Sequence, residues 1–165
     1  MSKLIALAFA FVSLAACASQ PPAPPVSSPA PVAAATVTPS GGTTGAADAR
    51  SAVLAFVTAG KNQDLDALSA VWGSTEGSVR TTNAIPRDEM EKRELIMMCY
   101  LEHETHQIVS DAPAANNERV VAVQLRRGSL TRTANFYAVA GPGGRWYVRA
   151  FEMEALTDFC RKRGR

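Results

Sequence analysis

The sequence predicts an α+β fold for residues 48–165, because helical patterns come first and strand patterns follow. Apolar residues recur at helical spacing up to Leu101 and then alternate with polar residues, which is the period of a half-buried strand. Glycine-rich turn signals separate the alternating segments. The segment of about 118 residues has a normal length for one hydrophobic core, so we expect a single folded domain.

Three helices are expected before the strands. Asp48 can cap the first helix, and Gly60 is expected to end it. Asp64 can cap a second, short helix that Gly73 ends. Pro86 suits the first turn of a third helix, because its missing N–H would have no partner there.

The third helix changes character along its length. Its first half, residues 87–94, is charged and is expected to face water. Its second half, residues 95–101, is apolar on all sides and is expected to be buried. The preceding segment, residues 74–84, is expected to be a polar loop.

An antiparallel meander is expected after the third helix. Residues 104–109 are a weak strand candidate. The clearer strand patterns are residues 119–126, 130–140 and 145–154, with turns at residues 127–129 and 141–144. We therefore expect the helices to pack on one antiparallel sheet.

The order of these elements resembles a nuclear transport factor two-like domain over about residues 48–156. The resemblance rests on a helix that ends in glycine, an Asp-Leu-Asp-Ala-Leu segment at residues 64–68 that leads to Trp72, and a Gly-Arg-Trp-Tyr-Val strand at residues 144–148. It implies the cone-shaped fold shared with ketosteroid isomerase, in which a curved sheet wraps over the helices. A cystatin-like domain or another helix-plus-meander fold is the competing interpretation.

The first sixteen residues have the pattern of a lipoprotein signal peptide. Lys3 precedes an apolar run of about 11 residues, which is shorter than the ~20 that span a bilayer as a helix. The sequence Leu14-Ala15-Ala16-Cys17 resembles the lipobox of bacterial lipoproteins, in which the cysteine thiol forms a thioether to diacylglycerol. The resemblance implies removal of residues 1–16 and lipidation of Cys17. An ordinary signal peptide with a chance cysteine is the alternative.

Lipidation at Cys17 would determine where the protein resides. Two acyl chains make a stable membrane anchor, whereas one chain binds only marginally. Ala18 follows the cysteine at a position where lipoproteins retained in the inner membrane often carry Asp. The resemblance therefore implies the outer membrane, facing the periplasm, if the cell has two membranes.

Residues 17–47 are expected to tether the domain to the membrane. Beyond Cys17, this segment has no charged and no aromatic residue, and it holds seven of the ten prolines. Such a composition buries too little apolar surface to offset the entropy of ordering it. We expect an extended or disordered spacer.

The charge balance excludes nucleic-acid binding. The chain has 17 basic and 15 acidic side chains, so it lacks the basic excess that a phosphate backbone requires.

The basic residues at the C-terminus are Arg161, Lys162, Arg163 and Arg165. They could contact anionic headgroups or wall polymers, and a solvated tail is the plainer interpretation.

Cys99 and Cys160 remain once Cys17 is lipidated. Exported chains sit in an oxidising compartment, so this pair is interpreted first as a disulfide. It would fasten the C-terminal tail to the buried end of the third helix. Two free thiols or a redox pair are the alternatives, although no Cys-x-x-Cys motif is present.

No catalytic, metal or cofactor site is predicted. His103 and His106 are three residues apart, not four as the zinc-protease motif requires, and in a strand they would point to opposite faces. Capping explains Asp48 and Asp64, and Asp111 is expected in a turn. A candidate cavity for a small apolar ligand is lined by Trp72, Tyr100, Phe136 and Trp146, unless these aromatic residues are core.

These observations predict a lipid-anchored protein of the cell envelope. Its α+β domain is expected to be non-catalytic, and to bind an envelope protein or wall polymer or to support envelope structure. Binding of a small apolar ligand in the cone cavity is the alternative, and an enzyme is a distant third.

Overall fold

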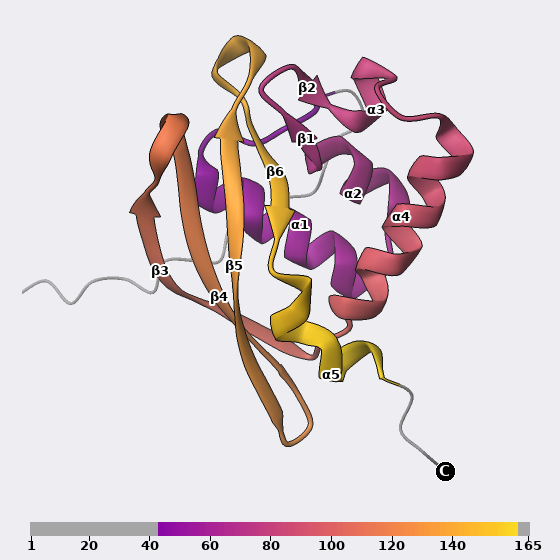
Figure 1. The fold of residues 1–165 in the computed structure, drawn as a ribbon, viewed down its shortest axis with the longest axis vertical. Helices are drawn as coiled ribbons and strands as arrows, with labels where there is room; N and C mark the ends of the chain where they lie inside the picture. The colour runs from indigo at the N-terminus through magenta and orange to yellow at the C-terminus, as the bar shows by residue number, and fades with distance from the viewer. Residues whose placement is uncertain (1–42, 162–165) are drawn as a thin grey trace, which may run out of the picture. The chain divides into compact units, whose positions relative to one another are not determined.

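The computed structural model of the chain describes residues 43–161. The predicted signal peptide, Cys17, most of the tether and residues 162–165 lie outside this range, so the predictions about them stay predictions. Within it, the predicted α+β class is confirmed, because helices precede an antiparallel sheet of four strands (Figure 1).

Within residues 43–161, four α-helices and a short strand pair precede the main sheet, where three helices were predicted. The α-helices are α1 (Ala49–Asn62), α2 (Leu65–Val71), α3 (Val79–Thr82), α4 (Arg87–Tyr100) and α5 (Thr157–Cys160). The strands are β1 (Gly73–Ser74), β2 (Gly77–Ser78), β3 (Thr105–Pro113), β4 (Glu118–Arg127), β5 (Leu130–Ala140) and β6 (Trp146–Phe151). Three short 3₁₀ turns are η1 (Ala115–Asn117), η2 (Pro142–Gly144) and η3 (Met153–Leu156).

Helix α1 begins as predicted and ends later than predicted. The Asp48 side chain accepts a hydrogen bond from the Ser51 amide at 2.8 Å. The helix continues past Gly60 to Asn62, and Gln63 caps it in the left-handed conformation. Gly60 has a packing role instead, because a Cβ there would lie 2.6 Å from Leu101 Cδ1. This glycine therefore permits close approach of the residue that follows α4.

The segment predicted as a polar loop before α4 is ordered in the structure. Strands β1 and β2 form a two-stranded antiparallel pair, and Ser78 then caps α3 through a hydrogen bond from the Thr81 amide. The loop prediction was wrong because these elements are only two to four residues long. At that length neither the helical nor the strand period can show in a sequence.

Helix α4 has nearly the predicted bounds, but its burial pattern differs. Glu94 from the charged half is 1% exposed, whereas Leu95 and Ile96 from the apolar half are 59% and 54% exposed. The helix contacts the domain through a single stripe at three- and four-residue spacing, namely Glu94, Met97, Met98 and Leu101 just past its end. Leu95 and Ile96 fall between the members of this stripe and so face solvent.

The main sheet has the strand order β3-β4-β5-β6, with antiparallel pairing throughout. Strand β3 is longer than predicted and reaches Pro113, so Asp111 lies in a strand and not in a turn. Cross-strand pairing and an ion pair between Asp111 and Arg119 at 2.8 Å extend the strand beyond what its weak alternation indicates.

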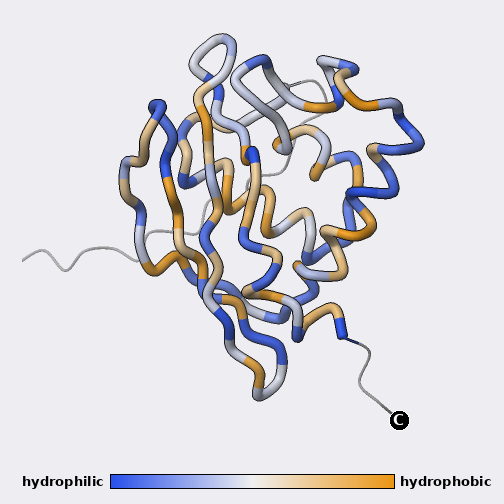
Figure 2. The backbone as a smooth tube through the Cα atoms, in the orientation of Figure 1, coloured by the Kyte–Doolittle hydropathy of each residue, from blue (hydrophilic) through white to orange (hydrophobic). Residues whose placement is uncertain are grey.

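The core lies between α1 and one face of the sheet (Figure 1). Phe56 of α1 contacts Phe136 of β5 and Phe151 of β6, with ring centroids 6.2 and 5.8 Å apart. Figure 2 shows polar and apolar residues interspersed along the strands, and α4 changing from a polar first half to an apolar second half. Alternation places polar residues such as Gln124, Thr133 and Asn135 on the opposite face of the sheet.

Candidate functional site

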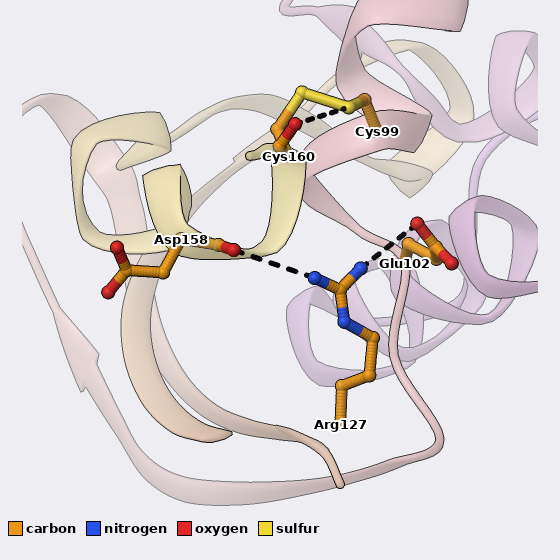
Figure 3. The surroundings of a disulfide bond; sticks show 5 residues. All are labelled: Cys99, Glu102, Arg127, Asp158 and Cys160. Atoms are coloured by element: carbon orange, nitrogen blue, oxygen red, sulfur yellow. Dashed lines mark hydrogen bonds and ion pairs between the residues drawn. A yellow bond between two sulfur atoms is a disulfide. The ribbon is translucent and has the colours of Figure 1, made fainter. Parts of the chain in front are cut away.

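Cys99 and Cys160 form a disulfide, as predicted (Figure 3). Cys99 lies near the C-terminal end of α4 and Cys160 is the last residue of α5. Their Cα atoms are 4.9 Å apart, across a sequence separation of 61 residues. The bond joins the C-terminal segment to the half of α4 that packs on the core.

Arg127 reinforces this connection at the end of β4. Its Nη1 donates to Glu102 Oε2 at 2.9 Å, and its Nη2 donates to the carbonyl oxygen of Asp158 at 3.5 Å (Figure 3). The guanidinium also lies over the ring of Phe159, 5.2 Å from its centroid. The Arg127 side chain is only 17% exposed, so these contacts are partly removed from water.

A second arginine, Arg132 on β5, pairs with the carboxylate of Asp158. In the sequence, Arg127 and Arg132 lie among several arginines of the predicted strands and turns, a pattern that is typical of solvated edges. It gave no signal that two of them meet the C-terminal helix. The disulfide, Arg127 and Arg132 together hold α5 against α4 and the β4–β5 hairpin.

The two histidines form a hydrogen-bonded pair, which corrects the expectation that they point to opposite faces. His103 precedes β3, so the alternation of a strand does not apply to it. His103 Nδ1 lies 2.6 Å from the carbonyl oxygen of Leu101, and its Nε2 lies 2.9 Å from His106 Nδ1. A carbonyl can only accept, so in the neutral pair His103 donates from Nδ1 and accepts from His106 at Nε2.

Burial keeps this pair uncharged. His103 is 6% exposed, and mainly its burial lowers its pKa to about 4. Burial and then the nearby Lys61 lower the pKa of His106. In the part of the chain that the structure describes, no three His, Cys, Asp or Glu side chains are placed to hold a metal ion.

Glu94 is a buried acid that sequence reasoning missed, because it lies within a run of charged residues. Its Oε1 has no hydrogen-bond partner in the described structure. Burial, followed by the negative charges of Glu91 and Asp66, raises its pKa to about 7. The side chain can therefore gain or lose a proton near neutral pH.

A pocket of about 190 Å³ lies between α2, α3 and the start of α4. Its lining residues are Asp66, Ser69, Val79, Arg80, Asn83, Ile85, Arg87 and Met90. Most of them are polar or charged. None of the four aromatic residues proposed for a ligand cavity belongs to this lining.

Those four aromatic residues lie in or against the core. Phe136 is fully buried and stacks on Phe151, with ring centroids 5.4 Å apart. Trp72, Tyr100 and Trp146 are partly buried and pack against the core cluster. Neighbouring side chains occupy the space beside Phe136, and a ligand cavity at these residues stays a prediction.

Comparisons of the chain with protein-family models, curated proteins and solved structures found no match. Among residues 43–161, no helix combines the length and the apolar character needed to cross a membrane.

Proposed function

We propose that the protein is a lipoprotein of the cell envelope, anchored by lipid on Cys17 and tethered through residues 18–47. The observation that carries this proposal is the sequence Leu14-Ala15-Ala16-Cys17, placed directly after a short apolar run. By the same resemblance, Ala18 favours the outer membrane facing the periplasm in a cell with two membranes.

The disulfide supports an exported location. Disulfides persist in oxidising compartments and are rare in the cytosol, where thiols are kept reduced. The Cys99–Cys160 bond joins two distant segments and shares its surroundings with the contacts of Arg127. These features are typical of a stabilising crosslink, not of a catalytic thiol pair.

The α+β domain is proposed to be non-catalytic, and to bind an envelope partner or support envelope structure. The support comes from the roles of four aspartates: Asp48 and Asp64 cap helices, while Asp111 and Asp158 pair with arginines. The helices-before-meander order also supports the cone-shaped, nuclear transport factor two-like architecture. The alternative, a small apolar ligand in the cone, gains no support from the polar lining of the pocket.

The substitution Cys17→Ser tests the anchor. We expect it to abolish incorporation of labelled fatty acid, because the serine hydroxyl cannot form the thioether. The matched control Ser19→Ala should keep the label. Unchanged acylation of Cys17→Ser would refute the proposal.

The role of the domain is tested by native mass spectrometry of residues 46–165 released from their own envelope. We expect an empty domain that crosslinks to a protein or wall-polymer partner before release. A co-purified small apolar molecule would instead favour the ligand alternative and contradict the partner role.

A further inference from the structure

Among the described residues, the first half of α4, residues 87–94, makes no ion pair with another element. The ion pairs that the structure gives these residues are Arg87–Glu91, Asp88–Lys92 and Glu89–Arg93. All three connect residues four apart on the same helix. They would therefore move with the helix and do not hold it against α2. We call residues 87–94 the α4 flap.

The second half of α4 is held firmly. Met97, Met98 and the following Leu101 are buried in the core. The disulfide from Cys99 adds a covalent connection to α5. Any movement of the flap would therefore bend α4 between Glu94, the last residue of the flap, and the buried Met97.

Glu94 is the buried polar contact of the flap, and it lacks a compensating partner. Its Oε1 is buried without a hydrogen bond. The charged groups that act on it are both acidic, Glu91 one turn earlier on α4 and Asp66 on α2. The other charged residues of the elements that pack on α4 are Arg50 and Lys61 on α1, Asp64 capping α2, Arg80 on α3, Glu154 on η3, and Asp158 with Arg161 at α5.

The cations among these residues have other contacts or are exposed. Lys61 Nζ donates to the carbonyl oxygen of Glu104 at 2.6 Å, and Arg80 donates to the carbonyl oxygen of Asp66 at 3.4 Å. Arg161 pairs with Asp158. A carboxylate at Glu94 would thus be buried beside negative charge, which is strongly unfavourable.

The pocket described above lies on the path of such a movement. Asp66 and Ser69 line it from α2, while Arg87 and Met90 line it from the flap. Met90 is one turn before Glu94 on the same stripe of α4. Separating the flap from α2 would widen this pocket and bring the Glu94 carboxylate to water.

We propose that the α4 flap opens when Glu94 ionises, widening the polar pocket between α2, α3 and α4 while the Cys99–Cys160 disulfide holds the base of the helix. The direction of the pH effect follows from a comparison of the closed and the open flap. The closed flap holds the Glu94 proton up to its raised pKa of about 7, whereas the pKa of the released carboxyl returns to its ordinary value of 4.5. The population of the open flap should therefore rise as pH increases from 4.5 to 7 and stay constant above pH 7.

Amide hydrogen exchange of the full chain, with its disulfide intact, tests this proposal. After correction for intrinsic exchange, we expect the population of the open flap, measured at the amides of residues 90–94, to rise about 70-fold between pH 5 and 8. The amides of β4 and β5 should stay better protected at every pH.

Three variants identify the group responsible. Glu94→Gln should remove the pH step, and Glu94→Met should do the same if the amide does not fold. Glu89→Gln changes an acid on the same helix that is ion-paired to Arg93, and it should keep the step. The proposal fails if the corrected wild-type exchange is independent of pH, if both Glu94 variants keep the step, or if the flap exchanges in unison with β4 and β5.

Discussion

Replacing Cys99 and Cys160 together by alanine is expected to lower the free energy of unfolding by about 4 kcal/mol. The bond closes a loop across 61 residues, and in the chain-entropy model such a crosslink restricts the unfolded chain. The loss should show as a lower urea midpoint, followed by tryptophan fluorescence of Trp72 and Trp146. Both proteins are compared in a Cys17→Ser background, so that neither carries lipid.

The contacts of Arg127 and Arg132 determine what remains after the disulfide is removed. Phe159 and Leu156 are buried next to this network, so the C-terminal segment has noncovalent support. We therefore expect the double variant to fold, with a lower midpoint. Its stability should depend on urea at least as steeply as that of the wild type, because the unfolded chain is no longer crosslinked. A loss below about 1 kcal/mol would contradict the stabilising role assigned to the disulfide.

The pH dependence of stability is expected to contain two large and opposed contributions. The pKa of His103 is lowered from 6.5 to about 4 in the folded state. Its contribution to the free energy of unfolding is therefore complete above pH 6.5 and is lost as pH falls to about 4. The pKa of Glu94 is raised from 4.5 to about 7 in the folded state. Its contribution to the free energy of unfolding is therefore complete below pH 4.5 and is lost as pH rises to about 7. Each difference corresponds to about 3 kcal/mol.

Single variants should reveal how each group changes the free energy of unfolding with pH. In the wild type the two changes have opposite signs and nearly cancel between pH 4.5 and 6.5. In Glu94→Gln, stability relative to wild type should increase with pH up to about 7. In His103→Gln, stability relative to wild type should increase as pH falls from 6.5 towards 4. The lost hydrogen bond lowers stability by the same amount at every pH and so does not change this trend. Urea unfolding from pH 4 to 8 measures both. Differences from wild type that do not vary with pH would refute the assigned burial of these groups.

The parts of the fold that were predictable are those determined by local chemistry. Asp48 and Asp64 cap helices, strand β5 has the bounds that its alternation predicts, and Cys99 pairs with Cys160. Each depends on a side chain with few alternative roles or on a pattern of ten or more residues. Such signals are present in the sequence before any tertiary contact forms.

The parts that were missed depend on how elements dock. A helix that is apolar on all sides does not reveal which stripe will be buried, and the packing of α4 selected Glu94 over Leu95 and Ile96. The histidine pair was missed because the strand begins two residues after His103. Arg127 was missed because its partners come from segments far apart in the sequence. These features required knowledge of three-dimensional neighbours.

The lipid anchor determines where the protein resides, and it is tested by mass spectrometry of the N-terminal peptide from membrane-extracted protein. We expect the mature chain to begin at Cys17 and this residue to carry the mass of a diacylglyceryl group. A mature chain that begins at another residue, or that begins at an unmodified Cys17, would contradict it.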